Sequence, residues 1–66
     1  MVKVSSFEDK GDMKKIIFSF DPNISPIQLL EEIELRLYEY FDFNGYDYDI
    51  EEIDEDEIVI SAWSVH

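Results

Sequence analysis

The sequence contains no cysteine, two glycines, two prolines and a single histidine, His66. Without cysteine the chain forms neither a disulfide nor a thiolate metal site, so packing alone must stabilise its fold. No stretch approaches the ~20 consecutive apolar residues that a membrane-spanning helix requires. Residues 1–6 read Met-Val-Lys-Val-Ser-Ser, which is too short and too polar for a signal peptide. We therefore expect a cytoplasmic protein.

Positive charge is also scarce, because 5 Lys and Arg residues stand against 17 Asp and Glu residues, for a formal net charge of -12. The excess is regional: residues 1–21 carry four lysines and four acidic residues, whereas residues 22–66 carry thirteen acidic residues and Arg36 alone. Nucleic-acid binding requires clustered Lys and Arg, and anionic lipid would repel this chain. We therefore expect no direct nucleic-acid contact and no membrane partner. Such charge is typical of solubility, a cationic partner or a halophilic habitat.

Apolar residues are plentiful by comparison, at 45% of the chain, and they include five Phe, four Tyr and one Trp. Intrinsic disorder requires low hydrophobicity together with high charge, so this content predicts a folded chain. A chain of 66 residues has room for one core only. We expect a single domain that covers residues 1–66.

Alternation of apolar and polar residues predicts four strands. Two of them, residues 2–7 and 14–20, flank a turn-forming segment that contains Asp, Lys and Gly. The third covers residues 46–51, with a bulge or an early turn expected at Glu52-Ile53. The last, residues 58–65, is apolar on both faces, which favours a central position in the sheet.

A helix is predicted between the second and third strands. Ser25 is a suitable N-cap, Pro26 suits the first helical position, and Gly45 suits the end of the helix. The residues predicted to share its buried face are Leu30, Ile33, Leu37, Tyr40 and Phe41. The order β-β-α-β-β predicts an α+β two-layer domain, in which one helix packs on a four-stranded, mainly antiparallel sheet.

Eight of the eleven residues from Asp47 to Glu57 are acidic, and no basic residue lies among them. The start of this acidic run resembles an EF-hand loop, but Glu52 stands where that loop needs Gly and Ile58 where it needs Glu. We therefore expect no metal site. Acid–base catalysis needs carboxylates in a cleft with divergent pKa values, and so small a domain has scarcely the volume for one. We expect neither an enzyme nor a bound cofactor, and no catalytic residue.

The acidic run has two interpretations. In the first, its charges protect an exposed strand from edge-to-edge aggregation. In the second, the carboxylates replace nucleic-acid phosphates, because same-face residues of a strand repeat every ~6.6 Å and a DNA strand advances one phosphate per ~3.4 Å. The predicted partner-binding carboxylates are Asp47, Asp49, Glu51, Glu52, Asp54, Glu55, Asp56 and Glu57 in the run, and Glu31, Glu32, Glu39 and Asp42 on the outer face of the helix.

Apolar residues expected at the surface also favour a protein partner. Helical phase directs Leu35 outward among the acidic residues and places Tyr38 at the border of that face. Strand alternation places Ile17, Val59 and Trp63 on the sheet face away from the helix, although a slip of one residue would bury Trp63 in the core. Aromatic residues inside a charged rim are typical of interaction hot spots. Leu35, Tyr38 and Trp63 are therefore the predicted anchors.

No run of residues identifies a family. In size and charge alone, the chain resembles small phage and plasmid proteins that imitate DNA, such as anti-restriction, anti-CRISPR and uracil-glycosylase inhibitors. The resemblance implies an inhibitor of a basic nucleic-acid-processing enzyme or DNA-binding protein, acting in the host cytoplasm if a phage encodes it. Two alternatives stay open. One is an immunity or antitoxin protein that neutralises a basic toxin, and the other is an assembly module that forms a homodimer or docks through its sheet face.

Overall fold

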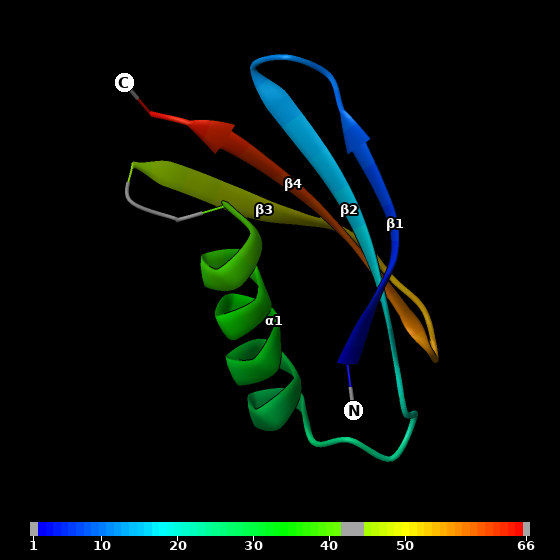
Figure 1. Cartoon of the computed structure of the whole chain (residues 1–66). Coiled ribbons are helices and arrows are strands. Elements are labelled where there is room, and N and C mark those ends of the chain that lie inside the picture. The colour runs from blue at the N-terminus through cyan, green and yellow to red at the C-terminus, as the bar shows by residue number, and fades with distance from the viewer. Residues whose placement is uncertain (1, 42–44, 66) are drawn as a thin grey trace.

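The computed structural model describes residues 2–41 and 45–65, without the side chains of residues 40 and 41. Its elements are β1 (Val2–Asp9), β2 (Met13–Phe20), α1 (Pro26–Phe41), β3 (Tyr46–Ile53) and β4 (Glu57–Ser64). The strands form one antiparallel sheet in the order β1-β2-β4-β3, and α1 packs across one face of it (Figure 1). The predicted two-layer α+β fold is therefore confirmed.

The strand order places β4 inside the sheet, between β2 and β3, as its two apolar faces predict. The edge strands are β1 and β3, so the acidic run begins on an edge. The register of β3 against β4 shifts between Ile50 and Glu52, slightly before the irregularity predicted at Glu52-Ile53. This bulge keeps the isoleucines on either side of it on one face, since Ile50 pairs with Ile60 and Ile53 pairs with Ile58.

The turn between β1 and β2 depends on Gly11, whose φ of 84° lies in the left-handed region that suits glycine. The Gly11 backbone N–H donates to Oδ1 of Asp9 over 2.9 Å, and the Lys14 ammonium donates to the same oxygen over 3.0 Å. Both interactions lower the pKa of Asp9, that with Lys14 more strongly, because each stabilises the carboxylate. The predicted first hairpin is thus held by its own acidic and basic residues.

The start of the helix is as predicted. The hydroxyl of Ser25 accepts a hydrogen bond from the Gln28 backbone N–H over 3.2 Å, and Pro26 is the first helical residue. The described helix ends at Phe41, and residues 42–44 lie outside the described chain, so the predicted helix-ending role of Gly45 stays a prediction. Gly45 has a φ of 91° and lies directly before β3.

The predicted buried face of the helix is confirmed at Ile33 and Leu37 and wrong at its first residue, Leu30. Leu29, Ile33 and Leu37 are buried at i, i+4 spacing, whereas Leu30 remains 41% exposed. Either of two adjacent leucines fits a helical stripe, and packing against the sheet selects Leu29. The side chains of Tyr40 and Phe41, also predicted to be buried, lie outside the described residues.

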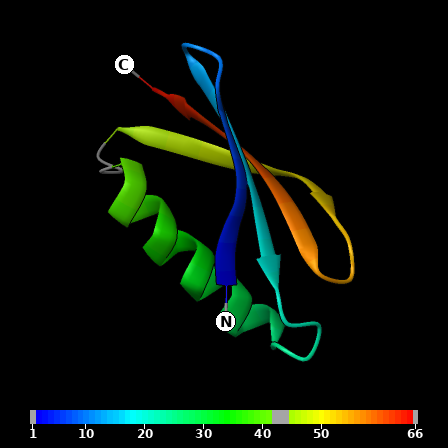
Figure 2. The ribbon, with the colours of Figure 1, turned by 45° about the vertical axis from the view of Figure 1, so that its right-hand side comes forward.

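The core lies between α1 and the helix-facing side of the sheet. Its buried hydrophobic members are Val2, Ile16, Phe18, Leu29, Ile33, Leu37, Ile58, Ile60 and Ala62. Ile16 pairs with Ile60 and Phe18 with Ile58, so the central strands β2 and β4 provide most of the sheet's share. In the turned view, α1 again lies against one side of the twisted sheet, and within the described chain no element covers the other side (Figure 2). No helix among the described residues has the length and apolar content needed to cross a membrane.

Candidate protein-binding surface

The strand part of the acidic run lies on the sheet face away from the helix, which we call the open face. Tyr48 and Ile50 pair with the buried residues Ala62 and Ile60, so these two residues face the helix. The residues that alternate with them therefore face away from it. Asp47 pairs with Trp63, Asp49 with Ser61 and Glu52 with Val59, and these three acidic residues are exposed.

Two of these carboxylates also bond to their own strand. Oδ1 of Asp47 accepts the backbone N–H of Tyr48 over 2.9 Å, and Oδ1 of Asp49 accepts the backbone N–H of Ile50 over 3.1 Å. In an edge strand, alternate N–H groups point away from the neighbouring strand and can pair with another chain. Asp47 and Asp49 occupy two such donors, so the edge-protection interpretation has direct support at these positions.

The remaining acidic residues of the run form the end of the second hairpin. The Asp54 backbone N–H donates to the Glu57 carbonyl over 2.8 Å, which closes the turn. The Phe20 backbone N–H donates to the Asp56 carbonyl over 2.9 Å, which attaches the hairpin end to β2. All four residues from Asp54 to Glu57 are exposed, and so is Glu51 at the bulge. The turn therefore holds four carboxylates in water on a fixed backbone.

The run has little neutralising charge nearby. The ion pairs within the described chain join Lys10 to Glu8, Lys14 to Asp9, and Arg36 to Glu39, so none includes a residue between 47 and 57. Four of the six residues concerned belong to the first hairpin, where acidic and basic residues balance. Most of the excess negative charge thus lies on the β3-β4 hairpin, and the rest lies on the helix segment.

The helix acids lie in a different layer from the open face. Glu31 is exposed, Glu32 is half-buried, and Glu39 receives the Arg36 guanidinium over 3.3 Å. Asp42 lies outside the described residues. Because α1 covers the opposite side of the sheet, the predicted helix and strand carboxylates do not form one flat surface (Figure 1).

The predicted anchors are likewise divided between two layers. Trp63 is half-buried and lies on the open face between Met13 and Asp47, as its register partners show. Its predicted orientation away from the helix is therefore confirmed. Leu35 and Tyr38 are 57% and 61% exposed on the helix, in the other layer. One flat partner surface cannot contact all three anchors.

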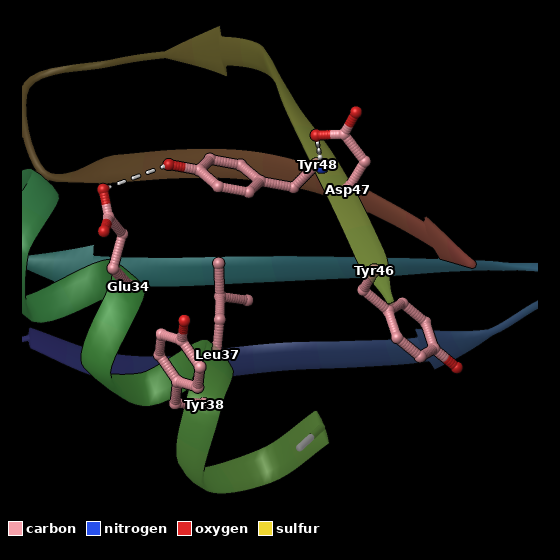
Figure 3. Close-up of a pocket in the computed structure, with 6 residues that line it drawn as sticks. All are labelled: Glu34, Leu37, Tyr38, Tyr46, Asp47 and Tyr48. Atoms are coloured by element: carbon pink, nitrogen blue, oxygen red, sulfur yellow. Dashed lines mark hydrogen bonds between the residues drawn. The ribbon is translucent and has the colours of Figure 1, made fainter. Parts of the chain in front are cut away.

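A small pocket lies where the two layers meet along β3 (Figure 3). Its volume is about 190 Å³, and its lining consists of Glu34, Leu37 and Tyr38 from α1 with Tyr46, Asp47 and Tyr48 from β3. The Tyr48 hydroxyl donates to Oε1 of Glu34 over 3.5 Å, which links the helix to the edge strand. Burial, followed by the negative charge of Glu34, raises the pKa of Tyr48, so its phenol stays protonated.

Alternation predicted Tyr46 and Tyr48 on a strand, but no sequence pattern predicted the role of Glu34 or the pocket. The spacing of Glu34 and Tyr38 was the available signal, because residues four apart lie on one flank of a helix. The spacing does not specify which strand this flank packs against, because tertiary packing decides that it faces β3.

Neither the protein-family models, the curated proteins nor the solved structures include a significant match to this chain. Within the described residues, no group of three His, Cys, Asp or Glu side chains is placed to hold a metal ion. The arrangement of charge, apolar groups and pocket therefore carries the functional argument.

Proposed function

We propose that this protein binds a basic nucleic-acid-processing enzyme or DNA-binding protein and inhibits it by occupying its nucleic-acid groove. The observation that carries the proposal is the β3-β4 hairpin, whose exposed carboxylates form no ion pair within the described chain. Such a surface attracts a cationic groove at long range and raises the rate of association.

The dimensions of the molecule support the same proposal. Its Cα extents are 36 × 18 × 15 Å, so it is elongated. A DNA strand advances one phosphate per ~3.4 Å, so the long axis matches about ten phosphates. The open-face carboxylates Asp47, Asp49 and Glu52 lie along one strand and continue into the turn at residues 54–57. This arrangement gives a rod-like body with a line of negative charge.

Apolar groups beside that line favour a protein partner over simple solvation. On the open face, Ile17 pairs with Val59 and Met13 pairs with Trp63, and the Lys15–Ser61 pair lies between them. The acidic strand β3 borders this stripe, which is apolar except at Lys15 and Ser61. Charge supplies orientation and speed, whereas buried aromatic and aliphatic groups supply most of the affinity. An immunity protein for a basic toxin would use the same physics. The same stripe is the observation that favours the other candidate, an assembly module that docks through its sheet face.

The test compares two variants of equal net charge. The first changes Glu51, Glu52 and Asp54 to Gln or Asn, and the control changes Glu8, Asp12 and Asp21 to Gln or Asn, so each removes three negative charges. Each immobilised protein is exposed to nuclease-treated lysate of the source organism, and bound proteins are eluted with a salt gradient. We expect the wild type and the control to retain a basic nucleic-acid enzyme that DNA displaces, and the first variant to lose it at lower salt.

Association rates then distinguish the candidate functions. For nucleic-acid mimicry, the on-rate for the captured enzyme should fall in the hairpin variant and with rising ionic strength. An on-rate that responds to neither change contradicts the proposal. Capture of a toxin encoded by a neighbouring gene supports the immunity function. A protein that binds only another copy of itself, with Trp63 shielded from quencher, supports the assembly module.

A further inference from the structure

The pocket between α1 and β3 combines aromatic rings with a carboxylate. Tyr38 and Glu34 lie on the helix, and Tyr46 and Tyr48 lie on the edge strand (Figure 3). Asp47 also lines the pocket, but its carboxylate points away from the helix and accepts the backbone N–H of Tyr48. The face of an aromatic ring carries partial negative charge and attracts cations, and a nearby carboxylate adds to that attraction. The lining is therefore suited to a positively charged group.

No basic side chain of the described residues lines this pocket. The Arg36 guanidinium donates to the Val2 carbonyl and pairs with Glu39, on the flank of α1 that faces β1. The Lys14 ammonium donates to Asp9 over 3.0 Å and to the Gly11 carbonyl over 3.2 Å. Lys14 also interacts electrostatically with Tyr46, but it is not one of the residues that line the pocket. The cation considered for the pocket is therefore one supplied by another molecule.

The volume limits what that cation is. Pockets for drug-sized ligands measure about 300–1,000 Å³, whereas an engineered cavity of about 150 Å³ holds benzene. At about 190 Å³, this pocket fits a planar group of benzene size, such as a guanidinium with its last methylene. A guanidinium stacks on aromatic rings and pairs with a carboxylate through two parallel N–H groups, whereas an ammonium offers only a point charge.

We propose that this pocket receives the guanidinium of an arginine side chain of the basic partner protein. The guanidinium lies among the tyrosine rings and donates to Glu34, and Asp47 lies at the border with the open face. The Tyr48–Glu34 hydrogen bond of 3.5 Å is long for an O–H donor, so the carboxylate can exchange it for a charged donor. The inference deepens the proposed function, because it gives the basic partner one defined point of attachment.

The first experiment uses the isolated protein and a small probe. N-acetyl-arginine methylamide is titrated into 15N-labelled protein, with the citrulline, lysine and tetramethylammonium compounds in parallel. We expect saturable amide shifts centred on Tyr38 and residues 46–48, a weaker effect of lysine and none of citrulline. The absence of saturable shifts at these residues overturns the proposal. So does equal binding of citrulline, or tighter binding of lysine or tetramethylammonium, which would indicate a different cation.

Matched variants separate the pocket from the general negative charge. Glu34→Gln should weaken binding of the arginine probe about three- to tenfold, the size of one cation contact in a partly desolvated site. Glu55→Gln removes the same charge at the hairpin turn and should change the affinity less than twofold. Equal losses in the two variants contradict a localised site. Tyr48→Phe keeps the ring and releases Glu34, so it should retain the probe.

These outcomes are independent of the partner capture described above. If the arginine probe does not bind while the hairpin carboxylates still direct association with a basic enzyme, the pocket assignment fails and nucleic-acid mimicry stands. If the probe binds selectively but the association rate with the basic enzyme does not depend on the hairpin charges, the pocket assignment stands and nucleic-acid mimicry fails.

Discussion

Replacing isoleucine by alanine at Ile33 and at Ile27 tests the same substitution at a buried and at an exposed site of α1. Ile33 is fully buried at the centre of the helix stripe, whereas Ile27 is 74% exposed in the first turn. Replacing a buried isoleucine by alanine removes its apolar contacts and leaves a cavity, which costs about 2–5 kcal/mol. At an exposed helical site the same change is nearly neutral, within about 0.5 kcal/mol, because alanine has the higher helix propensity.

The size of the domain makes this difference decisive. Native domains have a free energy of unfolding of roughly 0.05–0.15 kcal/mol per residue, which gives about 3–10 kcal/mol for this chain of 66 residues. Ile33→Ala therefore removes a large fraction of the total stability. Ile27→Ala leaves the total almost unchanged.

Urea unfolding followed by far-ultraviolet circular dichroism measures both variants. For a small protein the slope is on the order of 1 kcal/mol per molar urea, so a loss of about 3 kcal/mol lowers the midpoint by about 3 M. We expect the urea midpoint of Ile33→Ala to lie about 3 M below that of the wild type and Ile27→Ala to keep the wild-type midpoint. Equal midpoints for the two variants would refute the helix orientation on which the core and the pocket both depend.

Three further predictions concern helix packing and charge. Leu29→Ala should destabilise the fold by at least about 1 kcal/mol more than Leu30→Ala, because Leu29 is buried and Leu30 is largely exposed. A larger loss for Leu30→Ala in urea unfolding would contradict the observed rotation of the helix. The thermal midpoint should rise with added salt, because the Debye length falls from about 30 Å at 0.01 M to about 8 Å at 0.15 M and screens repulsion between carboxylates; a constant or falling midpoint would show that this repulsion does not limit stability. Lys14→Met should move the pKa of Asp9 upward toward its ordinary value in a carboxyl-detected NMR titration, because the hydrogen bond that most lowers that pKa is lost. In the wild type this lowered pKa stabilises the fold above the unfolded-state pKa of Asp9, and the contribution disappears as the pH falls through the folded-state value. An unchanged Asp9 titration in the variant would show that Lys14 is not the cause.

Local sequence patterns were sufficient to predict the elements of this fold. Ser25 and Pro26 define the start of α1 because capping involves only neighbouring residues. Strand alternation likewise predicted Trp63 on the open face, and the apolar residues on both faces of the last strand predicted the central position of β4. The choice of Leu29 over Leu30 was not predictable, since the sheet rather than the helix decides which leucine is buried.

The pocket depends on contacts that no local pattern encodes. Glu34 and Tyr48 come from different elements, and they meet because α1 crosses the sheet with one flank toward β3. The division of the acidic residues between two layers has the same origin. Sequence periodicity predicted the type and order of the elements, but neither their exact bounds nor the distances between them. The edge-protecting bonds of Asp47 and Asp49 become visible only once β3 is known to be an edge.

The pairing of β2 with β4 has a consequence for how the chain folds. The β1-β2 and β3-β4 hairpins form from neighbouring segments, whereas the central seam joins Ile16 to Ile60 and Phe18 to Ile58. Loop-closure entropy must be overcome before these distant partners meet, so the seam sets the folding rate more than either hairpin does. The seam also joins the charge-balanced β1-β2 hairpin to the acidic β3-β4 hairpin. The acidic hairpins of two protein copies repel each other and therefore pair poorly. The uneven distribution of charge thus favours the native pairing over a mismatched one between two copies.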